Sequence, residues 1–547
     1  MMNMKSLVLA VVATVACSSF AENWYVSESG DDNNDGKSWE TAFRRLSKAM
    51  GKATSGDKVW VEDGFECSAA KDDVKMAKGS GSGLAGDSYM VIVPPGVTLS
   101  SCSGDWRKGA TIRGYQADPA GANGISAGSW PCVGLKAGAS LIGIRCVEGM
   151  CTDRSHPCGG ICFADNVSIV SNCYIGNCIT PVNSNLRGAV YAPDSYKGAK
   201  VFDCVVENCT LGAFANCVVY DTVIRKCDSA AQKGVNTFYG GAVSNMNSIC
   251  FSASGTQVYG TEIAYNDQER ICTGTSSLFS KCDIHHNSRT NHATAIALFG
   301  GIGTVVSNCT IHANRTDSTA ASIKNASSGG LVFGSGVMAF GCTVTDNVLK
   351  GAIDNGTNKG GVIGASATLV NCYVADNEVA TGSAFVRDCT VVNTVLVHTN
   401  ADIYTMCYNG KFINSTVFGN GMSCPGASTN SVFLSGDGKT PDDRLRTNNI
   451  WTDRTPPVNC CTSRTDDPTG TSFSTDPKLD LDVTSKTFLM PLKGSPCIDK
   501  CTGDFDFDWM HAVGAKDACG HKRIIGLAAD IGGVEYKPTY GLQVLLR

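Results

Sequence analysis

The sequence predicts an all-β protein, a right-handed parallel β-helix in which similar coils stack on one another. The first observation is a short phrase, Cys282-Asp283-Ile284-His285-His286-Asn287, which recurs with its cysteine at Cys309, Cys342 and Cys372. These cysteines lie 27, 33 and 30 residues apart, a period typical of repeat proteins. The second is a set of glycine pairs that open another short apolar run, with no helical period between the runs. The third is composition, because 61 glycines and 17% charged residues suit strands and tight turns.

Each phrase is expected to form a strand with one buried face. Cys and Ile or Val alternate with variable residues, so the Cys and Ile/Val side chains should point inward. The closing Asn is expected at a corner of the coil, with the left-handed backbone angles that Asn tolerates. Further copies begin at Cys173 and Cys204, and a degenerate copy begins at Ser415. A β-sandwich whose strands resemble one another by chance is the alternative architecture.

The chain contains 28 cysteines, and two environments are expected for them. Ladder cysteines at the inward strand position should be reduced core residues, since stacked coils offer poor geometry for a disulfide. These are Cys282, Cys309, Cys342, Cys372 and Cys389. Clustered cysteines outside the ladder are the disulfide candidates, because export permits oxidation. They are Cys146, Cys151, Cys158 and Cys162, then Cys460, Cys461, Cys497, Cys501 and Cys519.

Four segments are expected along the chain: a signal peptide at 1–21, an N-terminal cap at 22–58, a parallel β-helix at 59–425 and C-terminal coils with a final module at 426–547. Lys5 precedes an apolar run, and Ser19-Phe20-Ala21 supplies small residues for cleavage before Glu22. A lipoprotein signal ending at Cys17 is the alternative. The apolar run is too short to span a bilayer, and no later run is long enough. The cap should contain a helix that Ser38 begins, with Phe43, Leu46, Met50 and Ala53 on one face over the open end of the solenoid.

Both ends of the mature chain resemble known bacterial proteins. Trp24-Tyr25-Val26-Ser27 and Gly56-Asp57-Lys58-Val59-Trp60-Val61 resemble the opening of secreted β-helix proteins of the pectate-lyase-like superfamily. Ser495-Pro496-Cys497-Ile498-Asp499 and Asp530-Ile531-Gly532-Gly533-Val534-Glu535-Tyr536 resemble the terminal module of choice-of-anchor Q proteins. The glycine pairs are more loosely similar to repeats of polymorphic outer membrane proteins. These resemblances imply a secreted or cell-surface protein, with attachment to an outer membrane as one form of that location.

Two classes of function follow from the predicted fold. One is a non-catalytic adhesin or glycan-binding scaffold, which the sequence favours because we recognise no catalytic motif of a lyase or hydrolase. The alternative is a polysaccharide lyase or glycoside hydrolase acting on an extracellular polysaccharide, since β-helices host many such enzymes. The partner in either case is an extracellular polysaccharide or a host or cell-surface glycan. A net charge of −5 without a basic stripe argues against nucleic acid, and a monomer is expected.

Two groups of residues are candidates for chemistry. His285 and His312 stand three residues after the ladder cysteines and should stack one coil apart beside Asp283, as an acid/base or transition-metal pair or as a plain polar ladder. Asp31, Asn33 and Asp35 alternate in an acidic turn that matches the first half of a calcium loop. Position twelve of that loop is Ala42 instead of Glu, so a solvated turn is the alternative. The sequence assures no cofactor; calcium is the one that the acidic turn suggests, and Asp504, Asp506 and Asp508 form a lesser acidic set.

Overall fold

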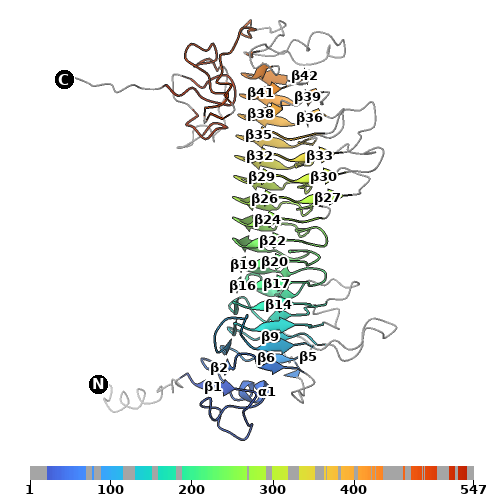
Figure 1. The fold of residues 1–547 in the computed structure, drawn as a ribbon, viewed down its shortest axis with the longest axis vertical. Coiled ribbons are helices and arrows are strands. Elements are labelled where there is room, and N and C mark those ends of the chain that lie inside the picture. Colours follow the sequence, from blue (N-terminus) through green and yellow to red (C-terminus); the bar gives the residue numbers. More distant parts are fainter. Residues whose placement is uncertain are drawn as a thin grey trace, which may run out of the picture.

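The computed structural model shows a long column of stacked coils (Figure 1). It describes residues 21–68, 77–78, 88–114, 130–150, 158–179, 188–267, 270–290, 298–317, 332–350, 362–364, 366–379, 384–398, 405–408, 410–419, 422–424, 427–434, 460–461, 470–482, 484–485, 487–501, 516–523 and 528–538. The predicted signal peptide at 1–21 therefore lies almost wholly outside the described residues. Within them no helix is long and apolar enough to cross a membrane.

Two long parallel sheets run the length of the column, and successive coils are neighbours in both. Sheet 1 has 16 strands among the described residues: β1 (Asn23–Val26), β2 (Lys58–Val61), β7 (Thr98–Ser101), β10 (Ser140–Ile142), β13 (Ile169–Ser171), β16 (Ala199–Phe202), β19 (Cys217–Tyr220), β21 (Thr237–Tyr239), β23 (Gln257–Tyr259), β25 (Leu278–Ser280), β28 (Val305–Ser307), β31 (Met338–Phe340), β34 (Thr368–Val370), β37 (Thr390–Val392), β40 (Lys411–Ile413) and β43 (Ala427–Thr429). Sheet 2 has 15 in the same part of the chain: β3 (Glu66–Cys67), β8 (Thr111–Arg113), β11 (Arg145–Val147), β14 (Tyr174–Gly176), β17 (Val205–Glu207), β20 (Val223–Arg225), β22 (Ala242–Ser244), β24 (Glu262–Ala264), β26 (Asp283–His285), β29 (Thr310–His312), β32 (Thr343–Thr345), β35 (Tyr373–Ala375), β38 (Val395–His398), β41 (Thr416–Gly419) and β44 (Val432–Leu434). The predicted parallel β-helix is confirmed.

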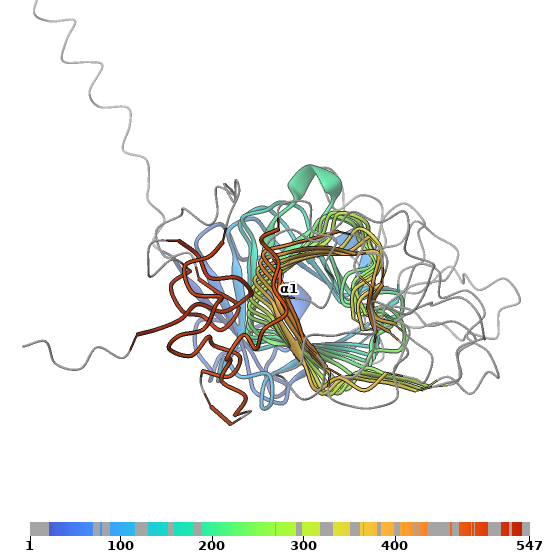
Figure 2. The same cartoon turned by 90° about the horizontal axis from the view of Figure 1, so that it is seen from above.

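Shorter strands complete the coils. A five-stranded parallel sheet contains β6 (Val91–Val93), β9 (Val133–Leu135), β12 (Ile161–Phe163), β15 (Val190–Tyr191) and β18 (Phe214–Ala215), and single parallel bridges from Phe214 to Val386 continue it toward β36. Two three-stranded sheets contain β27 (Ser288–Thr290), β30 (Arg315–Asp317) and β33 (Val348–Lys350), and β36 (Ala384–Arg387), β39 (Thr405–Tyr408) and β42 (Met422–Cys424). An antiparallel pair, β4 (Ala77–Lys78) and β5 (Ser88–Tyr89), and a 3-10 turn, η1 (Asp194–Tyr196), lie between the coils. Figure 2 shows that the coils superimpose along the column axis.

Aromatic and aliphatic side chains fill the interior. Phe238, Phe251, Phe279 and Phe299 form an edge-to-face series whose successive ring centroids lie 5.5, 5.4 and 5.0 Å apart. All four side chains are buried. Such aromatic pairs contribute about 0.5–1.5 kcal/mol each beyond the area that they bury. The series therefore holds consecutive coils in one register.

The cysteines of the repeated phrase align as predicted. Strand register places Cys282, Cys309, Cys342 and Cys372 in one column, each directly before a strand of sheet 2. The backbone N–H of Cys282 donates to Cys309 Sγ at 3.4 Å. Downstream in the same column the N–H of Cys372 donates to Thr394 Oγ1 at 3.1 Å. From Cys282 onward the described coils thus place Cys, Thr or Ser in this column, and each of these side chains has an acceptor atom.

Cys389 is a correction to the predicted ladder. It precedes β37, a strand of sheet 1, so it does not belong to the column of Cys282. The segment Cys389-Thr390-Val391-Val392-Asn393 resembles the phrase, because strands of sheet 1 and sheet 2 have a similar apolar pattern and end at a similar turn. Burial raises the pKa of the Cys389 thiol to about 12, so it remains a protonated core residue at neutral pH.

The closing asparagines are also corrected. Asn287, Asn314, Asn347 and Asn377 lie at the bend after sheet 2, as predicted, but the left-handed residue is the one before each of them, for example Ala313 with φ 52°. The four amides are buried and form a ladder in which each Nδ2 donates to the next Oδ1 at 2.8 Å. In the earlier coils Asn177 and Asn208 do adopt left-handed angles. At this bend the four asparagine side chains therefore point into the protein, where buried amide groups need hydrogen-bond partners.

The N-terminal helix is shorter than predicted. α1 spans Leu46–Met50, its N-cap is Arg45, and no side chain caps it. The prediction that Ser38 begins it is wrong, because Ser38 Oγ accepts the N–H of Thr41 in a preceding turn. Phe43 instead bridges to Val26 of β1. Leu46 and Met50 still join the main core, and α1 lies at the N-terminal end of the column (Figure 1).

The boundaries at 59 and 425 do not coincide with the limits of the sheets. β1 pairs in parallel with β2 through four register partners, so sheet 1 begins within the segment assigned to the cap. At the other end β43 and β44 extend both sheets beyond 425. The predicted start came from the strand within Gly56–Val61, and the predicted end came from the last, degenerate copy of the phrase at Ser415; the structure adds one strand before the first and one coil after the second.

The C-terminal module, residues 470–538 where described, packs beside the last coils instead of on their end (Figures 1 and 2). Outward side chains of β38 and β41 are apolar there, and Val395, Val397 and Phe418 form one buried cluster with Phe488 and Ile531 of the module. Inside the module Arg523 and Glu535 form a buried ion pair with Nη1 2.5 Å from Oε1. The described part of the module thus covers the outer face of sheet 2 at β38 and β41, whereas outward residues of earlier strands, such as Asp283 and Thr310, are exposed.

Candidate functional site

The predicted histidine candidates meet on the outer face of sheet 2. His285 and His312 occupy facing register positions in β26 and β29, and their rings stack with centroids 5.1 Å apart. His285 Nε2 lies 3.1 Å from Glu262 Oε1, and His312 Nε2 lies 3.1 Å from Asp283 Oδ1. Each imidazole is therefore paired with a carboxylate of the preceding coil. We call this group, Glu262, Asp283, His285 and His312, the histidine ladder.

The geometry of the histidine ladder limits its chemistry. Both Nε2 atoms face carboxylate oxygens, so the ladder consists of two parallel imidazole–carboxylate pairs, which have the parts of an acid/base couple. The carboxylate side chains of Glu262 and Asp283 are 52% and 54% exposed, so water competes for both pairs. Within the described residues no group of three or more His, Cys, Asp or Glu is placed to hold a metal ion. A further histidine, His292, follows His285 by seven residues in the sequence and lies outside the described residues.

Neighbouring aromatic groups extend the histidine ladder. His286 Nδ1 lies 2.9 Å from His285 Nδ1. The ring of Tyr265 stacks on His286 with centroids 5.3 Å apart, and Tyr265 is 55% exposed. Sequence reasoning did not include Glu262 or Tyr265, because their segment, Thr261-Glu262-Ile263-Ala264-Tyr265-Asn266, has Thr where the repeated phrase has Cys.

The carboxylates of the acidic turn already accept hydrogen bonds from nearby residues. Asp31 Oδ1 accepts the N–H and the amide of Asn33 at 2.9 and 3.0 Å. Asp35 Oδ1 accepts the hydroxyl of Thr41 at 2.6 Å and the N–H of Lys37 at 3.1 Å, and these bonds hold the pKa of Asp35 below its usual value. A calcium ion would have to replace these donors. Calcium binding at Asp31, Asn33 and Asp35 stays a prediction, and Asp504, Asp506 and Asp508 lie outside the described residues.

Most of the cysteines whose side chains the structure describes are buried, and Cys102 is the exposed one among these. Hydrogen bonding with Cys309, together with burial, raises the pKa of Cys282. The disulfide candidates Cys461, Cys497 and Cys519 carry free thiols in the structure, as do Cys146 and Cys501. Cys151 lies outside the described residues, and disulfides that involve it stay a prediction.

Site-resolved alkylation should separate these thiols. We expect iodoacetamide to modify Cys102 in the native protein within minutes and the ladder cysteines, such as Cys309, only after denaturation, because a buried protonated thiol is a poor nucleophile. Mass spectrometry of the peptides gives the extent at each site. Equal labelling of Cys102 and Cys309 in the native state would contradict the inward assignment, and failure to label Cys309 after denaturation without reductant would show a disulfide.

Sequence reasoning missed an aromatic ladder on the outer face of sheet 1. It consists of Phe202, Tyr220, Tyr239 and Tyr259, which share one register column in β16, β19, β21 and β23. Successive rings are parallel within 14° and their centroids lie 4.7, 5.0 and 5.1 Å apart. The signal was present in the sequence, because these residues are spaced by 18, 19 and 20.

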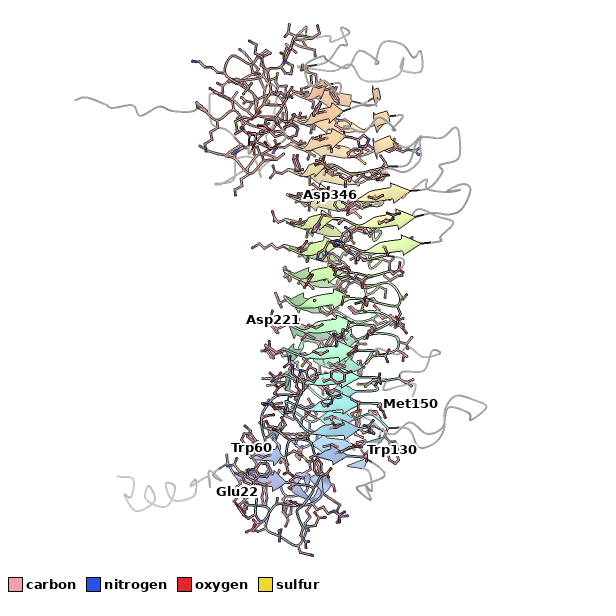
Figure 3. All side chains as sticks on the ribbon, in the orientation of Figure 1. Glu22, Trp60, Trp130, Met150, Asp221 and Asp346 are labelled. Carbon is pink, nitrogen blue, oxygen red and sulfur yellow. The ribbon has the colours of Figure 1, made fainter. Side chains whose placement is uncertain are left out.

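Polar side chains flank the aromatic ladder on both sides. Lys200 and Gln257 lie two residues before Phe202 and Tyr259 and are exposed. Asp203 and Asp221 follow at the corner, are exposed, and have left-handed backbone angles. Figure 3 shows Asp221 at the surface of the middle of the column. The ladder is thus an apolar strip with hydrogen-bonding groups along its margins.

A second aromatic group lies on sheet 2 near the N-terminal end. The rings of Trp106 and Tyr174 have centroids 5.1 Å apart. The guanidinium of Arg145 lies 4.7 Å from the Tyr174 ring centroid and 5.7 Å from that of Trp106. Register explains the contact of Arg145 with Tyr174, because the two residues face each other in β11 and β14.

No protein-family model matches the chain, and no curated protein matches it. Solved structures with a similar fold include pectate lyase Pel9A, 11% identical over 95% of this chain and 97% of that chain, with a TM-score of 0.24. A GH136 lacto-N-biosidase from Eubacterium ramulus is 14% identical over 65% and 67% of the two chains, with a TM-score of 0.33. A mannuronic acid specific family 6 lyase from human gut microbiota is 9% identical over 80% and 91%, with a TM-score of 0.29. At these values the likeness concerns the β-helix fold and not the activity.

Proposed function

We propose that this chain is a non-catalytic glycan-binding scaffold, secreted or held at the cell surface, that binds an extracellular polysaccharide or a cell-surface glycan as a monomer. The observation that carries the proposal is the aromatic ladder of sheet 1, with its four parallel rings on an outer face. Exposed aromatic groups on a soluble protein mark interaction surfaces more often than isolated apolar residues do.

The chemistry of the ladder suits a polysaccharide. The C–H faces of a pyranose are apolar and pack on aromatic rings, while its hydroxyls need donors and acceptors of the kind that Lys200, Gln257 and Asp221 provide. The next residue in the column after Tyr259 is Ser280, so no further ring covers the outer face of Tyr259. A sugar ring can therefore continue the stack where the protein's own rings stop.

Removing rings from the end of the ladder tests the proposal. We expect Tyr239→Ser with Tyr259→Ser to weaken binding of the best ligand in a glycan array about tenfold or more, as loss of a central aromatic contact does in other interfaces. Phe340→Ser is the matched control, since Phe340 lies in the same column of sheet 1 and is similarly exposed but is separated from the ladder by two serines. Equal binding by wild type and the double variant, with unchanged thermal melts, would contradict the proposal.

A polysaccharide lyase or glycoside hydrolase is the second candidate. The observation that favours it is the histidine ladder, in which His285 and His312 each hold a carboxylate at 3.1 Å on an exposed face. A base of this kind can abstract a proton from a bound sugar. The two candidates differ in whether the polymer gains new chain ends.

A further inference from the structure

A cleft lies where the C-terminal module meets the solenoid. Its volume is about 480 Å³. The corner between sheets 1 and 2 contributes Asn308, Asn371 and Tyr373, and the module contributes Lys516, Asp517 and Gly520. The lining residues come from parts of the chain more than a hundred residues apart, and most of them are polar.

Hydrogen bonds fix the two walls of the cleft relative to each other. The buried amide of Asn393 donates from Nδ2 to Asn371 Oδ1 at 2.8 Å and to the carbonyl of Lys516 at 3.2 Å. Gly533 N donates to Thr416 Oγ1 at 3.0 Å, which anchors the module to β41. The cleft is therefore formed before any ligand arrives, which lowers the entropy lost on binding.

A glycine keeps the solenoid wall open. Gly341 occupies the same corner column as Asn308 and Asn371 and has φ +60°. A Cβ at Gly341 would lie 2.7 Å from Asn308 Oδ1. The absence of a side chain at this position leaves the space that the cleft occupies.

Lys516 is the charged lining side chain of the cleft that a ligand can reach. Asp517 is not available to a ligand, because its carboxylate accepts the N–H groups of Cys519, His521 and Glu535 at 2.8–2.9 Å. Lys516 is exposed, and in the described part of the chain no carboxylate forms an ion pair with it. The Tyr373 hydroxyl is protonated at neutral pH, as an ordinary phenol is, and burial raises its pKa further, to about 12.

We propose that this cleft binds a carboxylated sugar, such as a uronic acid residue of a glycan. The sugar carboxylate pairs with the Lys516 ammonium, the hydroxyls bond the amides of Asn308 and Asn371, and the ring lies against Tyr373. Charge-assisted bonds of this kind are stronger than neutral ones. The proposal adds a class of ligand to the proposed glycan binding but involves none of the residues of the aromatic ladder.

Two lysines provide a matched test. Lys516 and Lys522 are both exposed and pair in one antiparallel bridge, but Lys516 lines the cleft and Lys522 does not. With glucuronic acid, galacturonic acid and glucose as probes in titrations followed by ligand-observed NMR, we expect wild type to bind at least one of the two acids more tightly than glucose. Lys516→Met should weaken that binding about tenfold or more, the usual effect of losing one charge-assisted bond. Lys522→Met should change it less than about twofold.

The outcome is independent of the aromatic ladder. Failure of both acids to bind the wild-type protein, or equal losses in Lys516→Met and Lys522→Met, would overturn the cleft proposal. Both side chains are exposed, so we expect unchanged thermal melts in either variant. Tyr239→Ser with Tyr259→Ser should leave binding of the sugar acids unchanged. The cleft proposal can therefore be judged even if glycan binding by the aromatic ladder is disproved.

Discussion

Replacing Ile311 by Asp is expected to unfold the coils around β29. Ile311 is fully buried and lies between Ile284 and Val344 in consecutive strands of sheet 2. The substitution removes apolar contacts and places a carboxyl group in the core, at a cost of at least about 3 kcal/mol. Because each coil of a solenoid is stabilised mainly by its neighbours, the loss should be greatest in the adjacent coils. Hydrogen exchange of their peptides, with circular dichroism melts, measures it.

Thr310→Asp is the control for this substitution. Thr310 precedes Ile311, is exposed, and is the register partner of Asp283 in the neighbouring strand β26. A carboxylate there stays in water, and the like-charged neighbour should cost less than about 1 kcal/mol. Similar destabilisation by the two substitutions would mean that the inward and outward faces of sheet 2 are wrongly assigned.

Replacing Asn314 by Leu should be nearly as damaging. Asn314 Oδ1 accepts the N–H and the amide of Asn287 at 3.1 and 2.8 Å, and its Nδ2 donates to Asn347 Oδ1 and to the Ile284 carbonyl. Leucine has a similar size but leaves the buried N–H of Asn287 without an acceptor. We expect a loss of roughly 2–4 kcal/mol, since an unsatisfied buried group costs more than a hydrogen bond contributes. Thermal melts and hydrogen exchange near 287–314 give the effect.

An exposed amide pair serves as the comparison. Asn208 Nδ2 donates to Asn177 Oδ1 at 2.7 Å on the surface, and Asn208 has φ 57°. Asn208→Gly removes the contact without backbone strain, because glycine adopts left-handed angles freely. We expect a change within about 0.5 kcal/mol. An equal effect of Asn314→Leu and Asn208→Gly on stability would show that burial of the asparagine ladder does not contribute to the stability of the fold.

The inward columns and the histidine pair could be predicted because both depend on short-range information. Alternation along a strand decides which side chains are buried, and equal spacing after the ladder cysteine places His285 beside His312. Parallel register then carries the pattern from coil to coil. For the same reason the prediction assigned Cys389 to the wrong sheet. Its local pattern is that of the phrase, but the sheet to which a strand belongs depends on the whole coil.

Other features had signals of a different kind. The aromatic ladder repeats at intervals of 18 to 20 residues, shorter than the spacing of the ladder cysteines, so a search guided by that spacing passes over it. The bend asparagines turn inward because the preceding residue takes the left-handed angle, as Ala313 and Asp346 do. The cleft has no local signal, because Tyr373 and Lys516 meet only through docking of the C-terminal module. Long-range packing of this kind is not encoded in any single window of sequence.

One incubation tests the central claim, which is that the protein binds glycans without cleaving them. The purified mature chain is mixed with acidic and neutral polysaccharides, and binding is followed together with new reducing ends and unsaturated ends. We expect at least one polymer to bind and none to gain ends. New ends that disappear in the variant with His285→Gln and His312→Gln would contradict the claim and make the histidine ladder a catalytic site.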